Sequence, residues 1–212
     1  MLKYLPVLAE GALMTVELTV ISIVVGSLLG FVIALGALSR NVVLRSIAHF
    51  YTWAIRGTPL MLQLFFIYYG LPEVGITLSP FAAASIGMSI NAAAYIAEIV
   101  RGAIQSIDKG QMEAARSIGM SYMQANFRII IPQAIRRMIP PLGNEFIAML
   151  KDSSLVATIS MVDLMRSAQQ MYSATFRPLE IFSAAALLYL LLTTIFTVTF
   201  GSIEARLAKM EA

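Results

Sequence analysis

The chain has 212 residues, of which 58% are hydrophobic and 13% are charged. Soluble domains carry about 25% charged residues, so this composition excludes an ordinary soluble domain. With no cysteine and one histidine, neither a cysteine nucleophile nor a metal site is expected. The apolar segments reach roughly 20 residues, the length that crosses a ~30 Å hydrocarbon core. We therefore expect a single transmembrane domain over residues 1–212, in contact with lipid and not with nucleic acid.

Five membrane spans are predicted in chain order: about Gly11–Leu38, Ile47–Leu71, Phe81–Ile104, Arg137–Leu150 with neighbouring residues, and Leu179–Ile203. The fourth has a short apolar core that Pro140 and Pro141 interrupt. The stretch after it, from Lys151 to Arg177, mixes charged with apolar residues, which suits a re-entrant or interfacial helix. Small residues recur at every fourth position of the first span and predict close packing against another helix, in the same chain or in a second copy: Ser22, Gly26, Gly30 and Ala34.

The basic residues give the expected topology. With the amino terminus outside, four of them lie outside: Lys3, Lys151, Arg166 and Arg177. Ten then lie inside: Arg40, Arg45, Arg101, Lys109, Arg116, Arg128, Arg136, Arg137, Arg206 and Lys209. The positive-inside rule therefore predicts a multi-pass membrane protein with its amino terminus outside and its carboxy terminus in the cytoplasm.

Residues 102–132 are too polar to be buried in the membrane, and they predict two short cytoplasmic helices. Asp108 with Gln111 forms a capping pattern for the first helix, and Gly119 supplies a left-handed residue at its end. Ser121 with Gln124 repeats the capping pattern for the second helix, which we expect Pro132 to terminate. The exposed apolar residues of this pair suit a groove on a partner, or alternatively the membrane surface: Met112, Ala114, Ala115 and Ile118.

The same segment resembles the EAA loop of ABC importer permeases. Glu113-Ala114-Ala115 is followed after three residues by Gly119 and after nine more by Ile129-Ile130-Ile131-Pro132, with Ile131 in place of the usual leucine. Three further strings resemble the polar amino acid branch of that family: Arg56–Leu60 (RGTPL), Asn91–Gly102 (NAAAYIAEIVRG) and Lys151–Leu155 (KDSSL).

The resemblance implies an all-α type I importer fold with five spans per subunit and two permease subunits per pore, in the cytoplasmic (inner) membrane of a prokaryote. We expect the second permease subunit to be a copy of this chain, with a different permease chain as the alternative. It also implies an extracytoplasmic solute-binding protein and two cytoplasmic ABC ATPase subunits, which bind ATP and Mg. The cytoplasmic helix pair would couple this chain to the ATPase through Met112, Glu113, Ala114, Ala115, Ile118 and Gly119.

The chain has no phosphate-binding GxxxxGK[ST] loop, and no lysine directly follows a glycine. It is therefore expected to be a transport subunit without ATPase activity. An ion-coupled secondary amino acid transporter is the alternative, because broken helices and buried carboxylates would serve such a carrier as well. An intramembrane protease is disfavoured because His49 lies at a span boundary.

Polar residues within the spans are the candidate solute ligands. Asn91, Tyr95 and Glu98 share a helical face, and Glu98 either contacts the solute or pairs with Arg101. Asn144 and Glu145 follow an expected helix break at Pro140-Pro141 and Gly143, and they form the preferred solute site.

Glu145 lies seven residues before Asp152 on a common face, which favours a cationic solute unless Glu145 pairs with Lys151. The solute is therefore predicted to be a basic amino acid. Its carboxylate would be bound by Asn144, Ser153 and Ser154. Arg56 is expected to lie at the membrane interface, and Asp163 is expected to pair with Arg166 within a helix.

Overall fold

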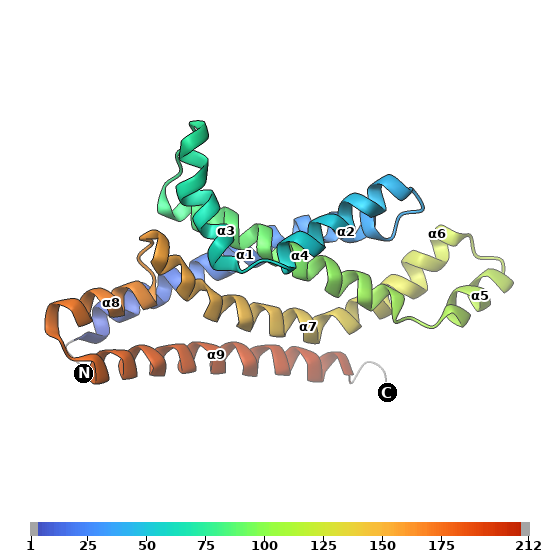
Figure 1. Ribbon diagram of the computed structural model, residues 1–212. Helices are drawn as coiled ribbons and strands as arrows, with labels where there is room; N and C mark the ends of the chain where they lie inside the picture. The colour runs from blue at the N-terminus through green and yellow to red at the C-terminus, as the bar shows by residue number, and fades with distance from the viewer. Residues whose placement is uncertain (1–3, 209–212) are drawn as a thin grey trace.

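The computed structural model describes residues 4–208 and is an elongated bundle of helices (Figure 1). The α-helices are α1 (Leu5–Ala37), α2 (Val42–Arg56), α3 (Leu60–Phe65), α4 (Pro80–Gln105), α5 (Lys109–Ser117), α6 (Tyr122–Ala125), α7 (Ile131–Asp152), α8 (Leu164–Thr175) and α9 (Pro178–Ala208). A π-helical turn (Phe66–Gly70) and a 3₁₀ turn (Leu71–Val74) follow α3. A second π-helical turn (Asn126–Ile130) joins α6 to α7, and a 3₁₀ helix (Ser153–Ile159) follows α7. The turn between α8 and α9 lies at one end of the bundle, and α5 and α6 lie at the other.

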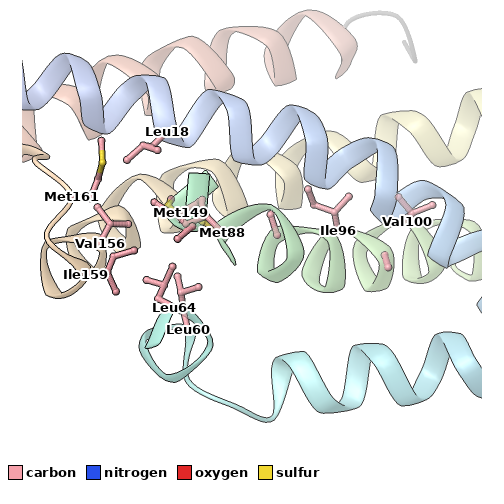
Figure 2. Close-up of a cluster of buried hydrophobic side chains, with 14 of the residues drawn as sticks. Leu18, Leu60, Leu64, Met88, Ile96, Val100, Met149, Val156, Ile159 and Met161 are labelled. Atoms are coloured by element: carbon pink, nitrogen blue, oxygen red, sulfur yellow. The ribbon is translucent and has the colours of Figure 1, made fainter. Parts of the chain in front are cut away.

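The centre of the fold is the close pair formed by α1 and α4. The predicted stripe of small residues on α1 is buried, and α4 of the same chain packs against it, which confirms the expected helix contact. A Cβ added at Gly26 would come within 2.7 Å of Ala92, and one at Gly30 within 2.8 Å of the Ala93 carbonyl oxygen. A buried cluster that includes Leu18, Leu64, Met88 and Met149 joins this pair to α3 and α7 (Figure 2).

Three helices within residues 4–208 are long and apolar enough to cross a membrane: Leu5–Ala37, Pro80–Gln105 and Pro178–Leu207. They correspond to the first, third and fifth predicted spans. The predicted continuous second span is wrong, because the chain breaks between α2 and α3 at Gly57-Thr58-Pro59. Proline and the residue before it leave the helical region, so a break there has a direct steric cause.

The fourth predicted span is a more continuous helix than the sequence predicted. The expected helix break is wrong, because Pro140 and Pro141 lie inside the continuous helix α7. Each proline removes one helical hydrogen bond, but packing against neighbouring helices can hold such a helix together. Here α7 packs against α4 and α9, and Phe146 of α7 contacts Phe196 and Phe200.

The segment after α7 forms the 3₁₀ helix and then α8, which packs against α1 and α9. The expected side-chain pair of Asp163 with Arg166 is wrong. Asp163 is fully buried and caps α8, because its Oδ1 accepts the backbone N–H of Arg166 at 2.8 Å. Its Oδ2 accepts the hydroxyl of Tyr189 at 3.4 Å. A carboxylate at a helix amino terminus accepts hydrogen bonds from free backbone N–H groups there. This explains why Asp163 bonds to the backbone N–H of Arg166 and not to its guanidinium.

Candidate functional site

The break between α2 and α3 is held by one glutamine side chain. The amide nitrogen of Gln63 donates to the carbonyl oxygens of Ile55 at 2.8 Å and Thr58 at 3.1 Å. Its amide oxygen accepts a hydrogen bond from Asn91 of α4 at 3.1 Å. The hydroxyl of Thr58 donates to the Ala54 carbonyl at 2.9 Å. These bonds satisfy carbonyl groups that the end of α2 leaves free, and they fix the break against α4.

A cavity of about 530 Å³ opens beside this break. It is lined by side chains from the α2–α3 break, α4 and the end of α7: Arg56, Gly57, Thr58, Pro59, Leu60, Asn91, Tyr95, Glu145, Ala148, Asp152 and Leu155. A volume of this size lies within the range of small-molecule sites. We call this space the polar cavity.

Opposite charges line the polar cavity. Glu145 is half-buried and Asp152 exposed, and both lie on α7 two turns apart. Arg56 ends α2, and its guanidinium carbon lies 5.2 Å from the centre of the Tyr95 ring. One nitrogen of Arg56 lies 3.8 Å from Glu98. The cavity can therefore present a cation at one part of its wall and carboxylates at another.

The structure brings together only some of the predicted solute ligands. Asn91 and Glu145 line the polar cavity, and Glu145 is not paired with Lys151 within residues 4–208. Asn144 is exposed and is not among the cavity-lining residues. Ser153 is fully buried and donates to the Leu150 carbonyl at 2.8 Å, and Ser154 is also not among the lining residues.

Two of these placements have a clear physical cause. Asn144 and Glu145 are adjacent on a regular helix, so they face directions about 100° apart. Glu98 is not among the cavity-lining residues and pairs with Arg101 at 2.6 Å. Tyr95, which shares the predicted polar face of α4, lines the cavity, whereas Arg56 was expected at the membrane interface and not as a ligand. The signal for Arg56 was the Gly57-Thr58-Pro59 sequence after it, which ends a helix and turns its last residue toward the break.

The cytoplasmic segment expected from the sequence forms α5, α6 and the turn between them. Asp108 caps α5 by accepting the Gly110 N–H at 2.7 Å, while Gln111 does not complete a capping box but accepts a bond from Gln133 of α7 at 3.4 Å. The expected left-handed Gly119 is confirmed, with φ +87°. The Met120 N–H bonds to the Ala115 carbonyl, and the Gly119 N–H bonds to the Arg116 carbonyl, as in a Schellman motif.

The second predicted helix begins as expected, because Ser121 and Gln124 form a reciprocal capping box. Its predicted end at Pro132 is wrong. Pro132 lies in the first turn of α7, and the chain remains helical from α6 through the π-helical turn into α7. Pro132 has no N–H to donate, and the π-helical turn lies directly before it, where the regular helical hydrogen-bond pattern is already interrupted.

The apolar residues of α5 differ in exposure. Ala114 and Ile118 are exposed, as is Glu113, but Ala115 is 1% exposed, so its expected exposure is wrong. Met112 is half-buried against Ile107, Ile130 and Ala134. Ala115 lies on the inner face of α5, which packs back onto the π-helical turn before α7. Three further exposed apolar residues, on α6 and the π-helical turn, were not predicted: Tyr122, Met123 and Phe127.

A charged side chain also ties this segment to the membrane helices. Arg137 of α7 donates to the carbonyl oxygen of Ser106 at 2.6 Å and to its hydroxyl at 3.0 Å. Ser106 caps the carboxyl end of α4, just before α5. Helix α7 therefore contacts α5 and the end of α4 at one end and lines the polar cavity at the other.

Comparisons with known proteins agree with this arrangement. A family described as the binding-protein-dependent transport system inner membrane component matches residues 22–209. The L-cystine transport system permease protein TcyB of Bacillus subtilis is 40% identical, covering 99% of this chain and 90% of that protein. The arginine transport system permease protein ArtQ of the same organism is 39% identical, covering 96% and 93%. The glutamine transport system permease protein GlnP of Escherichia coli is 40% identical, covering 96% and 94%.

Two solved structures share the fold. The crystal structure of an amino acid ABC transporter with histidines matches with a TM-score of 0.94 and 42% identity, covering 97% of this chain and 96% of that one. The MetNI methionine ABC transporter in an inward-facing conformation matches with a TM-score of 0.79 at 20% identity, covering 96% and 97%.

These features define a membrane-embedded permease subunit with the all-α fold of type I ABC importers, and they confirm the expected resemblance to the amino acid branch. The chain belongs to the family of binding-protein-dependent transport system inner membrane components.

Proposed function

We propose that this chain forms the pore of an ATP-driven importer that moves a basic amino acid, such as arginine, lysine or histidine, by alternating access. The observation that carries this proposal is the position of Glu145 and Asp152, both on the wall of the polar cavity. A carboxylate away from bulk water is costly unless a positive charge compensates it. A solute guanidinium or ammonium group can provide that charge during transit.

The similar proteins support the solute class only in part. One is named for arginine, and the others are named for cystine and glutamine. The same fold therefore serves several amino acids, and any preference of the permease itself comes from side chains in the cavity. In this chain the cavity places two carboxylates against one arginine, which favours a solute with a net positive charge.

The proposed assembly contains two copies of this chain, two cytoplasmic ABC ATPase subunits and an extracytoplasmic solute-binding protein. ATP and Mg bind to the ATPase subunits. The energy of ATP hydrolysis reaches this chain through the surface at α5 that includes Met112, Glu113, Ala114, Ile118 and Gly119. The buried Ala115 packs α5 against the rest of the chain. The exposed Ile118 and Ala114 provide an apolar contact for a groove on the ATPase.

The proposed orientation has the amino terminus outside and α5 in the cytoplasm. A cysteine introduced at Gly75 should react with a membrane-impermeant reagent from outside. A cysteine at Gln111 should react only from the cytoplasmic side. Both residues are exposed, so a lack of reaction reflects the side of the membrane rather than burial. The reverse labelling pattern would reverse the orientation and remove the proposed ATPase contact.

Substitution of Glu145 by glutamine tests the solute assignment, because it keeps the shape and removes the charge. We expect Glu145→Gln to lower arginine or lysine uptake by about tenfold or more, while ATPase association is kept. Glu17→Gln is the matched control, because Glu17 is exposed on α1 and does not line the polar cavity.

Uptake is measured in proteoliposomes that contain the assembled transporter and its solute-binding protein. Parent-like uptake of basic amino acids by Glu145→Gln, with neutral and acidic ones still excluded, would contradict the role of Glu145. Uptake that continues when ATP hydrolysis is blocked would instead support an ion-coupled carrier.

A further inference from the structure

The side chain of Arg56 occupies an unusual position for an arginine near a helix end. It is the last residue of α2, and the break at Gly57-Thr58-Pro59 directs it to the wall of the polar cavity instead of outward along the helix. Its side chain is 43% exposed, so its hydrogen-bond donors are open to a solute in the cavity.

Two neighbours orient the Arg56 side chain without using up its hydrogen-bond donors. The guanidinium lies over the ring of Tyr95 at 5.2 Å, a distance at which cation–π attraction acts. Its nearest approach to Glu98 is 3.8 Å, which is too long for a hydrogen bond. An arginine held in this way keeps its planar set of N–H donors available.

Glu98 cannot neutralise Arg56 fully because it is already committed to a second arginine. Arg101 donates three hydrogen bonds to the Glu98 carboxylate, at 2.6 Å, 3.2 Å and 3.2 Å. It donates a further one to Gln105 at 2.6 Å. One carboxylate therefore faces two guanidinium groups, so Glu98 compensates the charge of Arg56 only in part, and Arg56 shares the polar cavity with the carboxylates of Glu145 and Asp152.

The donors expected from the sequence for the solute carboxylate are poorly placed. Ser153 is fully buried and bonded to Leu150, and Asn144 and Ser154 are not among the cavity-lining residues. Arg56 is the cation among the residues that line the polar cavity within the described chain. Arginine also matches a carboxylate better than a hydroxyl or amide does, since two parallel N–H groups can bond both oxygens.

We propose that Arg56 binds the α-carboxylate of the transported amino acid, with Tyr95 and Glu98 as positioning residues. This inference rests on the proposed amino acid transport, but it is independent of which side chain the solute carries. Arg56 would restrict binding to solutes that carry a carboxylate. Glu145 and Asp152 would contact the cationic part of the solute. The polar cavity then recognises both ends of a basic amino acid through different side chains of its lining.

The test compares each amino acid with the amine that lacks only its carboxylate. The pairs are arginine with agmatine, and glutamine with 4-aminobutanamide. Equilibrium binding of each ligand is measured on the purified complex of permease and ATPase subunits, without the solute-binding protein, so that the permease itself makes the selection. The variants are Arg56→Gln and Arg56→Lys, with Arg45→Gln as the control, because Arg45 is exposed on the same helix and does not line the polar cavity.

For the parent and for Arg45→Gln we expect the amino acid to bind about 10- to 100-fold more tightly than its amine, the range of a charged hydrogen bond. Arg56→Gln should bring this ratio close to one. Arg56→Lys keeps the charge but loses the paired donors, so its ratio should fall between those of the parent and Arg56→Gln.

A ratio for Arg56→Gln equal to that of the parent would overturn the proposal. A ratio for Arg56→Lys equal to that of the parent would also overturn it, since long-range charge alone would then explain the preference. If the parent binds glutamine and not arginine, the proposed basic specificity fails, and the glutamine pair still decides the role of Arg56.

Discussion

The side-chain amide of Gln63 donates to the carbonyl oxygen of Ile55 at 2.8 Å, where a continuous helix would use the N–H of residue 59. Residue 59 is proline and has no N–H. Longer contacts of 3.4 Å from the Thr58 N–H and hydroxyl also reach this carbonyl. Gln63 therefore supplies the strongest hydrogen bond at the break and joins it through Asn91 to α4.

We expect Gln63→Leu to lower the free energy of unfolding by about 1–3 kcal/mol, because it removes the shortest hydrogen bond to the Ile55 carbonyl and the partner of the Asn91 amide. The thermal midpoint of the purified protein in detergent measures this effect. Gln170→Leu is the control, since Gln170 is exposed on α8, and it should change the midpoint little. Equal midpoints for the two variants would show that the amide does not hold the break.

The contact between α1 and α4 predicts different results for two glycines of the same helix. A Cβ at Gly30 would lie 2.8 Å from the Ala93 carbonyl oxygen, so Gly30→Ala should force the helices apart and cost about 1–3 kcal/mol. A Cβ at Gly36 would meet its nearest atom at 3.5 Å, an ordinary contact. Gly36→Ala should therefore be neutral or gain up to about 1 kcal/mol. Chemical denaturation of both variants checks the difference, and a Gly30→Ala protein as stable as Gly36→Ala would refute it.

The role of the turn between α5 and α6 can be tested with a substitution that acts only through backbone strain. An added Cβ would meet nothing within 4 Å at either Gly119 or Gly102, but only Gly119 has a positive φ of +87°. Gly119→Ala should cost about 1–2 kcal/mol locally and weaken co-purification with the ATPase subunit. Gly102→Ala lies in helix α4 and should retain full association. Undiminished association and transport in Gly119→Ala would show that this turn is not required for coupling.

The buried cap at Asp163 predicts a pH dependence of stability. Burial raises the pKa of Asp163 from 3.8 to about 6, although backbone N–H groups of Arg166 and Met165 oppose this. The folded protein then binds a proton more tightly than the unfolded chain does, so this contribution to stability is complete below pH 4 and is lost as the pH rises through about 6. Asp163→Asn should remove this dependence, which thermal unfolding between pH 4 and pH 8 measures. An unchanged pH profile in Asp163→Asn would assign the dependence to other groups.

Local patterns in the sequence predicted the parts of the fold that depend on neighbouring residues. The left-handed Gly119 and the capping box of Ser121 with Gln124 act within one turn, and the stripe of small residues on α1 follows from the periodicity of a single helix; all three are confirmed. The cytoplasmic position of α5 and the solute site remain predictions.

The errors arise where distant segments decide between local alternatives. Two different proline sites show this clearly: Pro59 breaks a span, whereas Pro140 and Pro141 do not. At Pro59 the side chain of Gln63 satisfies the broken end, while α7 is supported by packing against α4 and α9. Arg56 was missed for the same reason, because its direction follows from the break and from the distant Tyr95.

The uninterrupted helical path from Tyr122 to Asp152 has a consequence for how this chain can vary. Each added or deleted residue in a helix rotates everything beyond it by about 100° and shifts it by about 1.5 Å. A one-residue insertion between the π-helical turn and Glu145 would turn the carboxylates of α7 away from the polar cavity, or displace Gln133 from α5. We therefore expect this stretch to tolerate substitutions that alter solute preference, but not changes in length. The exposed turn at Gly75 should behave in the opposite way, because it has room for added residues while the positive φ of +87° at Gly75 favours glycine.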